Sequence, residues 1–495
     1  MARIWQLGVQ EVRPGTYFRT SSGDVTAEGA TNGIVALIYH GNWGPLNQVV
    51  DISPEDMNNL EEIVGTGTGY NAARQAFIGG AKMIRAVRAG SGGEKAQKTL
   101  MSTETQKTIT NADGTTTTQT IAPMAAVRIY AKYPGEWRFY ITVKTDLVTG
   151  KKQILFYRND KLIECIYYTG SADDATAATK AINSDSKYFT AKRMNSGTKL
   201  KVATVTQVKS SVGVNPTYNA SLYTAATDVL ERYPWNVIIT DCYHEKYSNI
   251  LAAFIRQVYE NGHMGMAVVG GRKSIALADR MAYAASINDW RVVYVLNGWV
   301  DNNGVVQQSY ASAARIAGMI AACETNASIT HLVIQDAVKL HETFTNAQMI
   351  NAEQKGCMIL SLNDSEQVWV DNAINTLVTL GNDQDDGWKK IRRTKCRFEL
   401  MDRINRTCDK LVGRLNNDAR GRATILAAMT TVIREMIAER KLVEGSYAME
   451  NPAYVSTADK AYFKLVIGDY DSMEKIYLDY VFSYASPFDG SAISA

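Results

Sequence analysis

Apolar runs alternate with amphipathic stretches between residues 214 and 364. Strands are predicted at 235–240, 266–269 and 291–296, and helices at 221–233, 245–261, 273–286 and 308–324. In the stretch 245–261, for example, Leu251, Phe254 and Val258 fall on one stripe of a helix. Strands that are apolar throughout are typical of a parallel sheet that helices cover on both faces. This part of the chain is therefore predicted to be an α/β domain.

The N-terminal region supplies further elements for the same domain. Residues 33–39 and 82–88 predict strands, residues 71–77 predict a helix, and Ser53 before Pro54 predicts the start of another. The glycines between 90 and 93 predict a boundary. The α/β core is thus expected to combine residues 21–93 and 214–364, with a largely parallel sheet.

Residues 94–213 have a different texture, rich in threonine and alternating with a period of two. Strands are predicted at 115–120, 127–133, 139–143 and 154–157, the first of them after the hairpin signal Asp113-Gly114. This segment interrupts the α/β pattern, so it is predicted to be a β-rich insertion domain that faces outward.

The C-terminal residues 365–485 predict an α+β domain, followed by a small polar tail at 486–495. A strand at 367–370 precedes two amphipathic helices, the second capped by Asn417-Asp418. A closing hairpin is expected to pair 462–467 with 476–482 across the turn 468–471. At the other end of the chain, residues 1–20 alternate weakly up to Pro14-Gly15 and predict an extended arm.

Composition narrows the class of protein. The 495 residues are 46% hydrophobic and 21% charged, which is typical of a globular protein. The formal net charge is only +3, so the chain as a whole has no strong positive potential that would attract nucleic acid or anionic lipid. Six scattered cysteines contain no CxxC pair, so we expect free thiols and a reducing compartment. No signal peptide and no apolar run of about 18 residues is present, so synthesis in a cytoplasm is expected.

Two glycine-rich loops could contact phosphate, but neither has the required spacing. Residues 65–69 precede a helix, yet the third glycine of a dinucleotide fingerprint would fall at Tyr70. Residues 270–274 follow a strand without the spacing of a phosphate loop. A flexible loop and a helix cap are the favoured interpretations, and no cofactor is expected.

Histidine and cysteine chemistry leaves one alternative open. His244-Glu245 and His341-Glu342 are halves of a zinc motif, but Ser248 and Thr345 stand where the second histidine belongs, so no metal is expected there. Asp241, Cys242 and His244 follow a predicted strand, where α/β enzymes place their sites. Helix capping is the favoured interpretation of this cluster, and an enzyme built on it is the alternative.

A basic run is the strongest local charge feature. It begins with Lys389, Lys390, Arg392 and Arg393 and continues along a predicted helix. A solvated face, a patch for an acidic protein and a nucleic-acid surface are the three interpretations, and the last lacks any recognisable motif.

Six short stretches carry recognisable motifs. In chain order they are Arg13 to Tyr17, Trp43-Gly44-Pro45, Gln75 to Ala81, Lys132 to Trp137, Leu411 to Arg422 and Asp471 to Leu478. Together they resemble the sheath proteins of contractile phage tails and related contractile injection particles. The resemblance spans nearly the whole chain and implies a structural subunit rather than an enzyme. It implies stacked hexameric rings around a tail tube, contraction that drives the tube through a target envelope, and a place in a virion or phage-like particle.

The resemblance also implies partners and contact residues. The partners are further copies of the chain, a tail tube protein, and baseplate and tail terminator proteins, without nucleic acid or direct membrane insertion. Terminal arms would be exchanged as added strands, and the apolar residues expected to mediate this are Ile4, Leu7, Val9, Val12, Leu465, Ile467, Ile476, Leu478, Tyr480 and Phe482. The hypothesis for Lys389, Lys390, Arg392 and Arg393 is that they face an acidic tube exterior.

Overall fold

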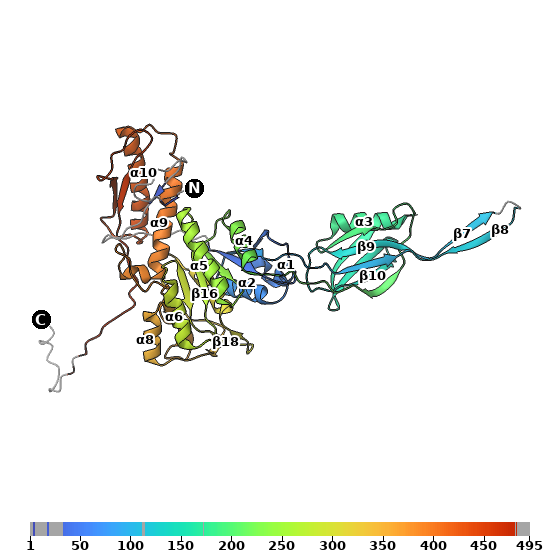
Figure 1. Ribbon diagram of the computed structural model, residues 1–495, viewed down its shortest axis with the longest axis horizontal. Coiled ribbons are helices and arrows are strands. Elements are labelled where there is room, and N and C mark those ends of the chain that lie inside the picture. The colour runs from blue at the N-terminus through green and yellow to red at the C-terminus, as the bar shows by residue number, and fades with distance from the viewer. Residues whose placement is uncertain are drawn as a thin grey trace.

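The computed structural model describes residues 3–4, 17–18, 33–110, 114–171, 173–480 and 482. The molecule is elongated, with a helical C-terminal part at one end, a sheet-centred core in the middle and a β-rich part at the other end (Figure 1). A two-stranded hairpin forms the far tip of the β-rich part (Figure 1).

The core is built on a seven-stranded sheet with the order β21-β17-β16-β15-β3-β5-β4. Its strands are β3 (Ile34–Tyr39), β4 (Val49–Ile52), β5 (Met83–Arg88), β15 (Val237–Thr240), β16 (Met266–Gly270), β17 (Val292–Val295) and β21 (Cys357–Met358). All neighbours pair in parallel except β4, which is antiparallel to β5. The predicted α/β core and its largely parallel sheet are confirmed.

Helices cover both faces of this sheet because its strands are apolar on both faces. Val35 and Leu37 of β3 pack on the side of α2 and α7, whereas Ile34 and Ile38 pack on the side of α4 and α5. The helices of the core region are η1 (Pro54–Asn59), α1 (Leu60–Val64), α2 (Thr68–Ile78), α4 (Ala220–Leu230), α5 (Glu245–Glu260), α6 (Leu277–Ile287), α7 (Tyr310–Ala322) and α8 (Asn346–Gln354). A small sheet of β18 (Trp299–Asp301), β19 (Val306–Gln307) and β20 (Ala337–Leu340) lies beyond β17 in the chain.

A histidine between α5 and β16 makes the stability of the core depend on pH. The Nε2 atom of His263 lies 3.0 Å from the carbonyl oxygen of Trp235, and the two rings are 4.2 Å apart. Burial lowers the pKa of His263 from 6.5 to about 4. Between these values the unfolded chain binds a proton that the folded chain does not, so stability is complete above pH 6.5 and is lost as the pH falls towards 4.

We therefore expect the free energy of unfolding to fall by about 1–2 kcal/mol between pH 7 and pH 5 through this residue. Urea unfolding at the two pH values measures the loss. His263→Gln should reduce the loss, whereas His331→Gln, at an exposed ring stacked on Trp369, should retain it. An equal loss in wild type and His263→Gln would contradict the assignment.

The β-rich part contains two sheets and one helix around their own apolar core. Its elements are β6 (Gln97–Met101), β7 (Thr105–Thr110), β8 (Thr116–Ile121), β9 (Ala125–Ala131), β10 (Tyr140–Thr145), β11 (Lys152–Arg158), β12 (Lys161–Tyr168), α3 (Asp174–Asp185), β13 (Phe189–Arg193) and β14 (Val205–Lys209). The sheet orders are β13-β9-β6 and β12-β11-β10-β14, and β7 pairs with β8 as the hairpin at the tip. The chain enters and leaves through antiparallel bridges between Ser91 and Thr217 and between Glu94 and Val214.

Buried side chains join the β-rich part to the core. The ring of Trp43 from the core lies 4.4 Å from that of Trp137 and belongs to the apolar core of the β-rich part. Arg88 at the end of β5 is 1% exposed and donates hydrogen bonds to the carbonyl oxygens of Gly41, Gly44 and Pro134. These contacts come from both parts, so they hold the two parts together.

The C-terminal part packs two long antiparallel helices against a two-stranded sheet. Its elements, from the end of the core onward, are β22 (Leu360–Leu362), β23 (Val368–Val370), η2 (Asp386–Lys389), α9 (Ile391–Asp409), α10 (Ala419–Ala438), β24 (Tyr447–Glu450) and β25 (Phe463–Val466). The Asp418 side chain caps α10 by accepting a hydrogen bond from the Gly421 amide, as predicted. The predicted α+β character of this part is confirmed.

The predicted closing hairpin is wrong. β25 pairs with β24, from Tyr447↔Val466 to Glu450↔Phe463, and not with residues 476–480 or 482, which are the described residues of the predicted partner. From Asp471 to Tyr480 the chain has no regular secondary structure, and beyond the contacts of Glu474 it extends away from the body, as Figure 1 shows near the C-terminal end. Alternation of apolar residues predicts a strand-forming segment but does not identify its partner, and here the partner strand precedes β25.

Candidate functional site

A cluster of polar side chains lies where the order of the central sheet changes direction. From β3 the chain proceeds to β5 on one side and later returns to place β15 on the other side. In α/β sheets, ligands bind at such switch points, beyond the carboxyl ends of the strands. His40 follows the last residue of β3, and Asp241 and Cys242 follow the last residue of β15.

Asp241 is the centre of this cluster and is completely buried. One carboxylate oxygen accepts hydrogen bonds from the Thr68 hydroxyl at 2.7 Å and from the His40 backbone N–H at 3.1 Å. The other oxygen accepts a hydrogen bond from the Tyr223 hydroxyl at 2.7 Å. Thr68 begins α2 and Tyr223 lies in α4, so the carboxylate ties together two strands and a helix from each face of the sheet.

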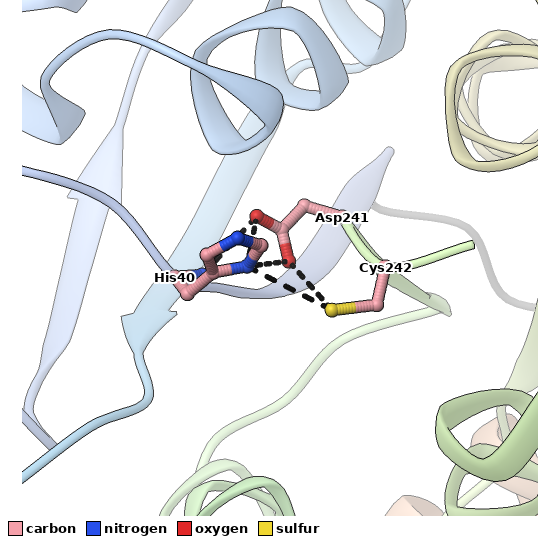
Figure 2. A group of neighbouring side chains, drawn as sticks. All are labelled: His40, Asp241 and Cys242. Carbon is pink, nitrogen blue, oxygen red and sulfur yellow. Dashed lines mark hydrogen bonds and ion pairs between the residues drawn. The ribbon is translucent and has the colours of Figure 1, made fainter. Parts of the chain in front are cut away.

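The ring of His40 brings its Nδ1 atom to the same point. This atom lies 3.2 Å from Oδ1 of Asp241, 3.2 Å from the Tyr223 hydroxyl and 3.7 Å from Sγ of Cys242. Figure 2 shows the imidazole edge, the carboxylate and the thiol pointing towards one another. The Tyr218 ring stacks on the imidazole at a centroid distance of 3.9 Å and fixes its orientation.

The arrangement does not activate Cys242 as a nucleophile. Burial, with the Asp241 charge as a second cause, raises the pKa of the Cys242 thiol, whereas reactive cysteines have a lowered pKa. A nucleophile–histidine–carboxylate relay places its two partners on different ring nitrogens. Here Cys242 and Asp241 both approach Nδ1, so the imidazole cannot relay a proton between them.

Sequence reasoning found half of this cluster. Asp241 and Cys242 lie together as expected, but His244 does not join them, because its side chain caps α5 by accepting a hydrogen bond from the Lys246 amide. His40 and Tyr223 were missed. His40 directly follows the predicted strand 33–39, so the rule that parallel strands end at one edge could have found it, whereas nothing in the sequence points to Tyr223.

The other candidate motifs serve the fold. A Cβ atom on Gly69 would lie 2.5 Å from the Tyr39 ring, so this glycine allows close packing. Glu342 binds the buried Arg280 through two hydrogen bonds of 2.7 and 2.8 Å. Among the described residues, His40, Asp241 and Cys242 are the one group of three histidine, cysteine or acidic side chains close enough to share a metal ion.

The basic run is not the continuous solvated face that its sequence suggests. Lys389 lies in η2, is about one-third exposed and pairs with Asp386 at 2.7 Å, while Lys390 pairs with Glu474. Arg392 is buried, and Arg393 forms an ion pair with Asp469. The acidic partners Asp469 and Glu474 come from the segment after β25, so much of this positive charge is neutralised within the chain.

The residues predicted for strand exchange fall into three groups. Ile4 lies in β1 (Arg3–Ile4), which pairs in parallel with β2 (Tyr17–Phe18), while Leu7, Val9 and Val12 lie outside the described residues. Leu465 and Ile467 pack against the α9–α10 core. The third group is strongly exposed along the C-terminal extension and comprises Ile476, Leu478, Tyr480 and Phe482.

No helix in the described part of the chain is both long and apolar enough to cross a bilayer. All six cysteines are free thiols, and four of them are buried.

Comparison with known proteins finds one family model that matches part of the chain. Residues 217–376 match the family model for the central domain of phage tail sheath proteins. The matched range begins near α4 and covers the strands β15, β16, β17 and β21. The matched family is the one that the short motifs resemble, and those motifs all lie outside the matched range. A search of the curated proteins finds no match.

Solved structures extend the similarity to the fold of nearly the whole chain. A sheath tail protein from Desulfitobacterium hafniense is 16% identical, with a TM-score of 0.66 over 91% of this chain and 99% of that one. A sheath tail protein from Listeria innocua is 17% identical, with a TM-score of 0.62 over 91% and 96%. The helical sheath of the anti-feeding prophage in its contracted state is 10% identical, with a TM-score of 0.54 over 96% and 100%.

Proposed function

Since residues 217–376 carry the central domain of the phage tail sheath family, we propose that this chain is the structural subunit of a contractile tail sheath. Its subunits form stacked hexameric rings around a tail tube, and contraction of the sheath drives the tube through a target cell envelope. This role needs no catalytic residues, in keeping with the raised thiol pKa at Cys242. The assembly takes place in a bacterial cytoplasm, and the mature location is the tail of a phage or phage-like particle.

The observation that carries the proposal is the exposed apolar extension at the C-terminus. The side chains of Ile476, Tyr477, Leu478, Tyr480 and Phe482 are each at least 68% exposed. A row of apolar side chains on an extended backbone is unfavourable in a free subunit and marks a segment that binds a protein surface. An extended segment with this pattern can add a strand to an exposed sheet edge.

The chain also offers a suitable acceptor for such a strand. In the described part of the chain β24 and β25 pair only with each other, so each leaves one edge open. An open edge is a template for pairing with another chain. We assign these edges to arms from neighbouring subunits, with Leu465 and Ile467 below them in the apolar core. Each backbone hydrogen bond contributes roughly 0.5–1.5 kcal/mol, so an arm of about five residues contributes several kcal/mol to the free energy of binding between two subunits.

The extension is anchored before it leaves the body. Glu474 accepts hydrogen bonds from the hydroxyls of Ser328 and Thr330 at 3.1 and 3.0 Å and pairs with Lys390. Asp469 is held by Arg393 and lies 3.7 Å from Arg397. The anchored base gives the arm a defined origin, while the part beyond it reaches a neighbour and preserves connectivity when the domains rotate.

Contraction in this proposal is driven by domain contacts that become more extensive in the contracted state. The extended sheath is then kinetically trapped, and its release needs no nucleotide. The remaining partners are the tail tube protein on the inside and the baseplate and tail terminator proteins at the two ends.

Lys389 is the residue of the basic run best placed to face an acidic tube, because its side chain is 36% exposed and its partner Asp386 is 84% exposed. Lys390 and Arg393 pair with carboxylates that are largely buried, and Arg392 is itself buried. Lys389→Glu should weaken assembly on tube protein while leaving folding intact. Lys355→Glu, at an exposed site after α8, is the matched control. Co-assembly with purified tube protein, followed by sedimentation at several salt concentrations, measures the effect. Equal assembly of the two variants would refute the tube-facing role.

Negative-stain electron microscopy of the purified chain, alongside sedimentation velocity, tests the proposed function. Striated hollow tubes would support it, as would a monomer that assembles once tube protein and baseplate are supplied. A discrete particle that fails to assemble with both would overturn it.

A further inference from the structure

We propose that His40, Asp241 and Cys242, together with the Tyr223 hydroxyl, form a binding site for one transition-metal dication of the zinc type. The site lies at the carboxyl ends of β3 and β15, where His40, Asp241 and Cys242 point towards one another (Figure 2), and Tyr223 joins it from α4. It is independent of the role proposed for the whole chain.

The four donor atoms have the spacing of a tetrahedral metal site. Nδ1 of His40, Oδ1 of Asp241 and the Tyr223 hydroxyl are separated by 2.7 to 3.2 Å. Sγ of Cys242 lies 3.1 Å from the hydroxyl, 3.6 Å from Oδ1 and 3.7 Å from Nδ1. Tetrahedral bonds of about 2.0 Å to nitrogen and oxygen and about 2.3 Å to sulfur place the donors roughly 3.3–3.6 Å apart. A shift of a few tenths of an ångström therefore converts the cluster into a coordination shell.

Donor chemistry selects the class of ion. A thiolate with an imidazole is a ligand set for zinc and its borderline-soft neighbours, whereas calcium and magnesium prefer oxygen donors throughout. Three donors here are of the residue types that bind zinc, and the Tyr223 hydroxyl stands at the fourth corner. When Nδ1 of His40 carries no proton, its single lone pair can bind one ion, and that ion can be shared with Asp241, Tyr223 and Cys242.

Charge supports the same conclusion. In the described part of the chain no lysine or arginine pairs with the completely buried Asp241 carboxylate, and its hydrogen-bond partners are hydroxyls, an amide and the Cys242 thiol. The one side chain that could carry a positive charge beside it is His40, whose Nδ1 atom lies 3.0 Å from Oδ2, and an ion bound at Nδ1 would take the place of that proton. A buried charge is costly unless it is paired or binds a metal. A dication with one carboxylate and one thiolate is a neutral unit, so its burial avoids that cost.

The site is preformed and open to ions. The hydrogen bonds that the Thr68 hydroxyl and the His40 amide donate hold the carboxylate, and stacking on Tyr218 holds the imidazole, as the outer partners of metal sites do. The side chain of His40 is 27% exposed, which provides the path of entry. A bound ion would join the two central strands to α4 and so stabilise the core, to which the β-rich part and the C-terminal part are attached.

The first test is cobalt(II) binding by the purified full-length chain after treatment with a chelator. One equivalent of cobalt should produce a near-ultraviolet thiolate-to-cobalt charge-transfer band and the intense visible bands of tetrahedral cobalt. One equivalent of zinc should remove both. Absence of the charge-transfer band from the wild-type chain would overturn the proposal without reliance on any variant.

Variants assign the ligands. Cys242→Ser should lose the charge-transfer band, and Tyr223→Phe should retain it while cobalt affinity falls by about 10- to 100-fold. Cys357→Ser, at a buried cysteine in β21, is the matched control and should bind as the wild type does. Far-ultraviolet circular dichroism of the metal-free variants checks that each is folded. A charge-transfer band that persists in a folded Cys242→Ser, or disappears in Cys357→Ser, would overturn the assignment.

Discussion

A chain that ends at Lys475 is expected to fold as the full-length chain does but to remain monomeric. The truncation keeps Glu474, which anchors the base of the extension, and removes the exposed apolar residues from Ile476 onward. The fold loses no internal strand, because β25 pairs with β24 and not with the extension. Sedimentation velocity and electron microscopy of the two chains measure the loss of polymer, which should be complete.

Charged substitutions separate this specific contact from a general loss of apolar surface. Ile476→Asp combined with Leu478→Asp should also prevent polymerisation, because one face of the added strand would carry buried carboxylates. Leu147→Asp with Val148→Asp is the matched control, since these residues lie between β10 and β11 and are 98% and 92% exposed. Polymerisation of the truncated chain at the wild-type concentration would remove the exchange of the C-terminal arm from the proposal.

Arg88→Met is expected to destabilise the protein more than any surface substitution. The guanidinium donates to backbone carbonyls of Gly41, Gly44 and Pro134, and methionine fills its space without replacing a single donor. Each buried polar group left without a partner costs about 1–3 kcal/mol, so the total is expected to reach about 3 kcal/mol or more. Urea unfolding followed by tryptophan fluorescence suits this site, because Trp43 and Trp137 are in contact beside it.

Arg406→Met is the control for the loss of an arginine. Its side chain is 62% exposed and pairs with Asp402 one helical turn away, an interaction worth about 0.3–0.5 kcal/mol. Arg88→Lys should remain strongly destabilised, because one ammonium group cannot reproduce the planar fork of donors. An unfolding midpoint for Arg88→Met within the range of Arg406→Met would mean that the junction does not depend on these hydrogen bonds.

Several elements could be predicted because their signal is local. The strands β3, β5, β15, β16 and β17 and the helices α4, α5 and α7 lie where the apolar pattern places them. The spacing of apolar residues along a short segment shows whether its buried face repeats as in a helix or as in a strand. Helix caps are also local, since the Asp418 side chain accepts its hydrogen bond from an amide only three residues later. The family resemblance likewise rested on short contiguous motifs, two of which, around Trp43 and Trp137, meet in the folded chain.

Tertiary structure decided what depends on residues far apart in the chain. The partner of β25, the burial of Arg392 and the pairing of Lys390 with Glu474 follow from packing, because each depends on which distant segments the fold brings together. The cluster at Asp241 follows the same rule: His40 lies about 200 positions away along the chain and Tyr223 lies in a helix without any local signal. The α/β core, the β-rich part and the C-terminal α+β character could be predicted without the structure, since each is a repeating local pattern. The side chains that meet at the switch point of the sheet and the apolar segment that remains uncovered could not be predicted, since both depend on strand order and packing between distant residues.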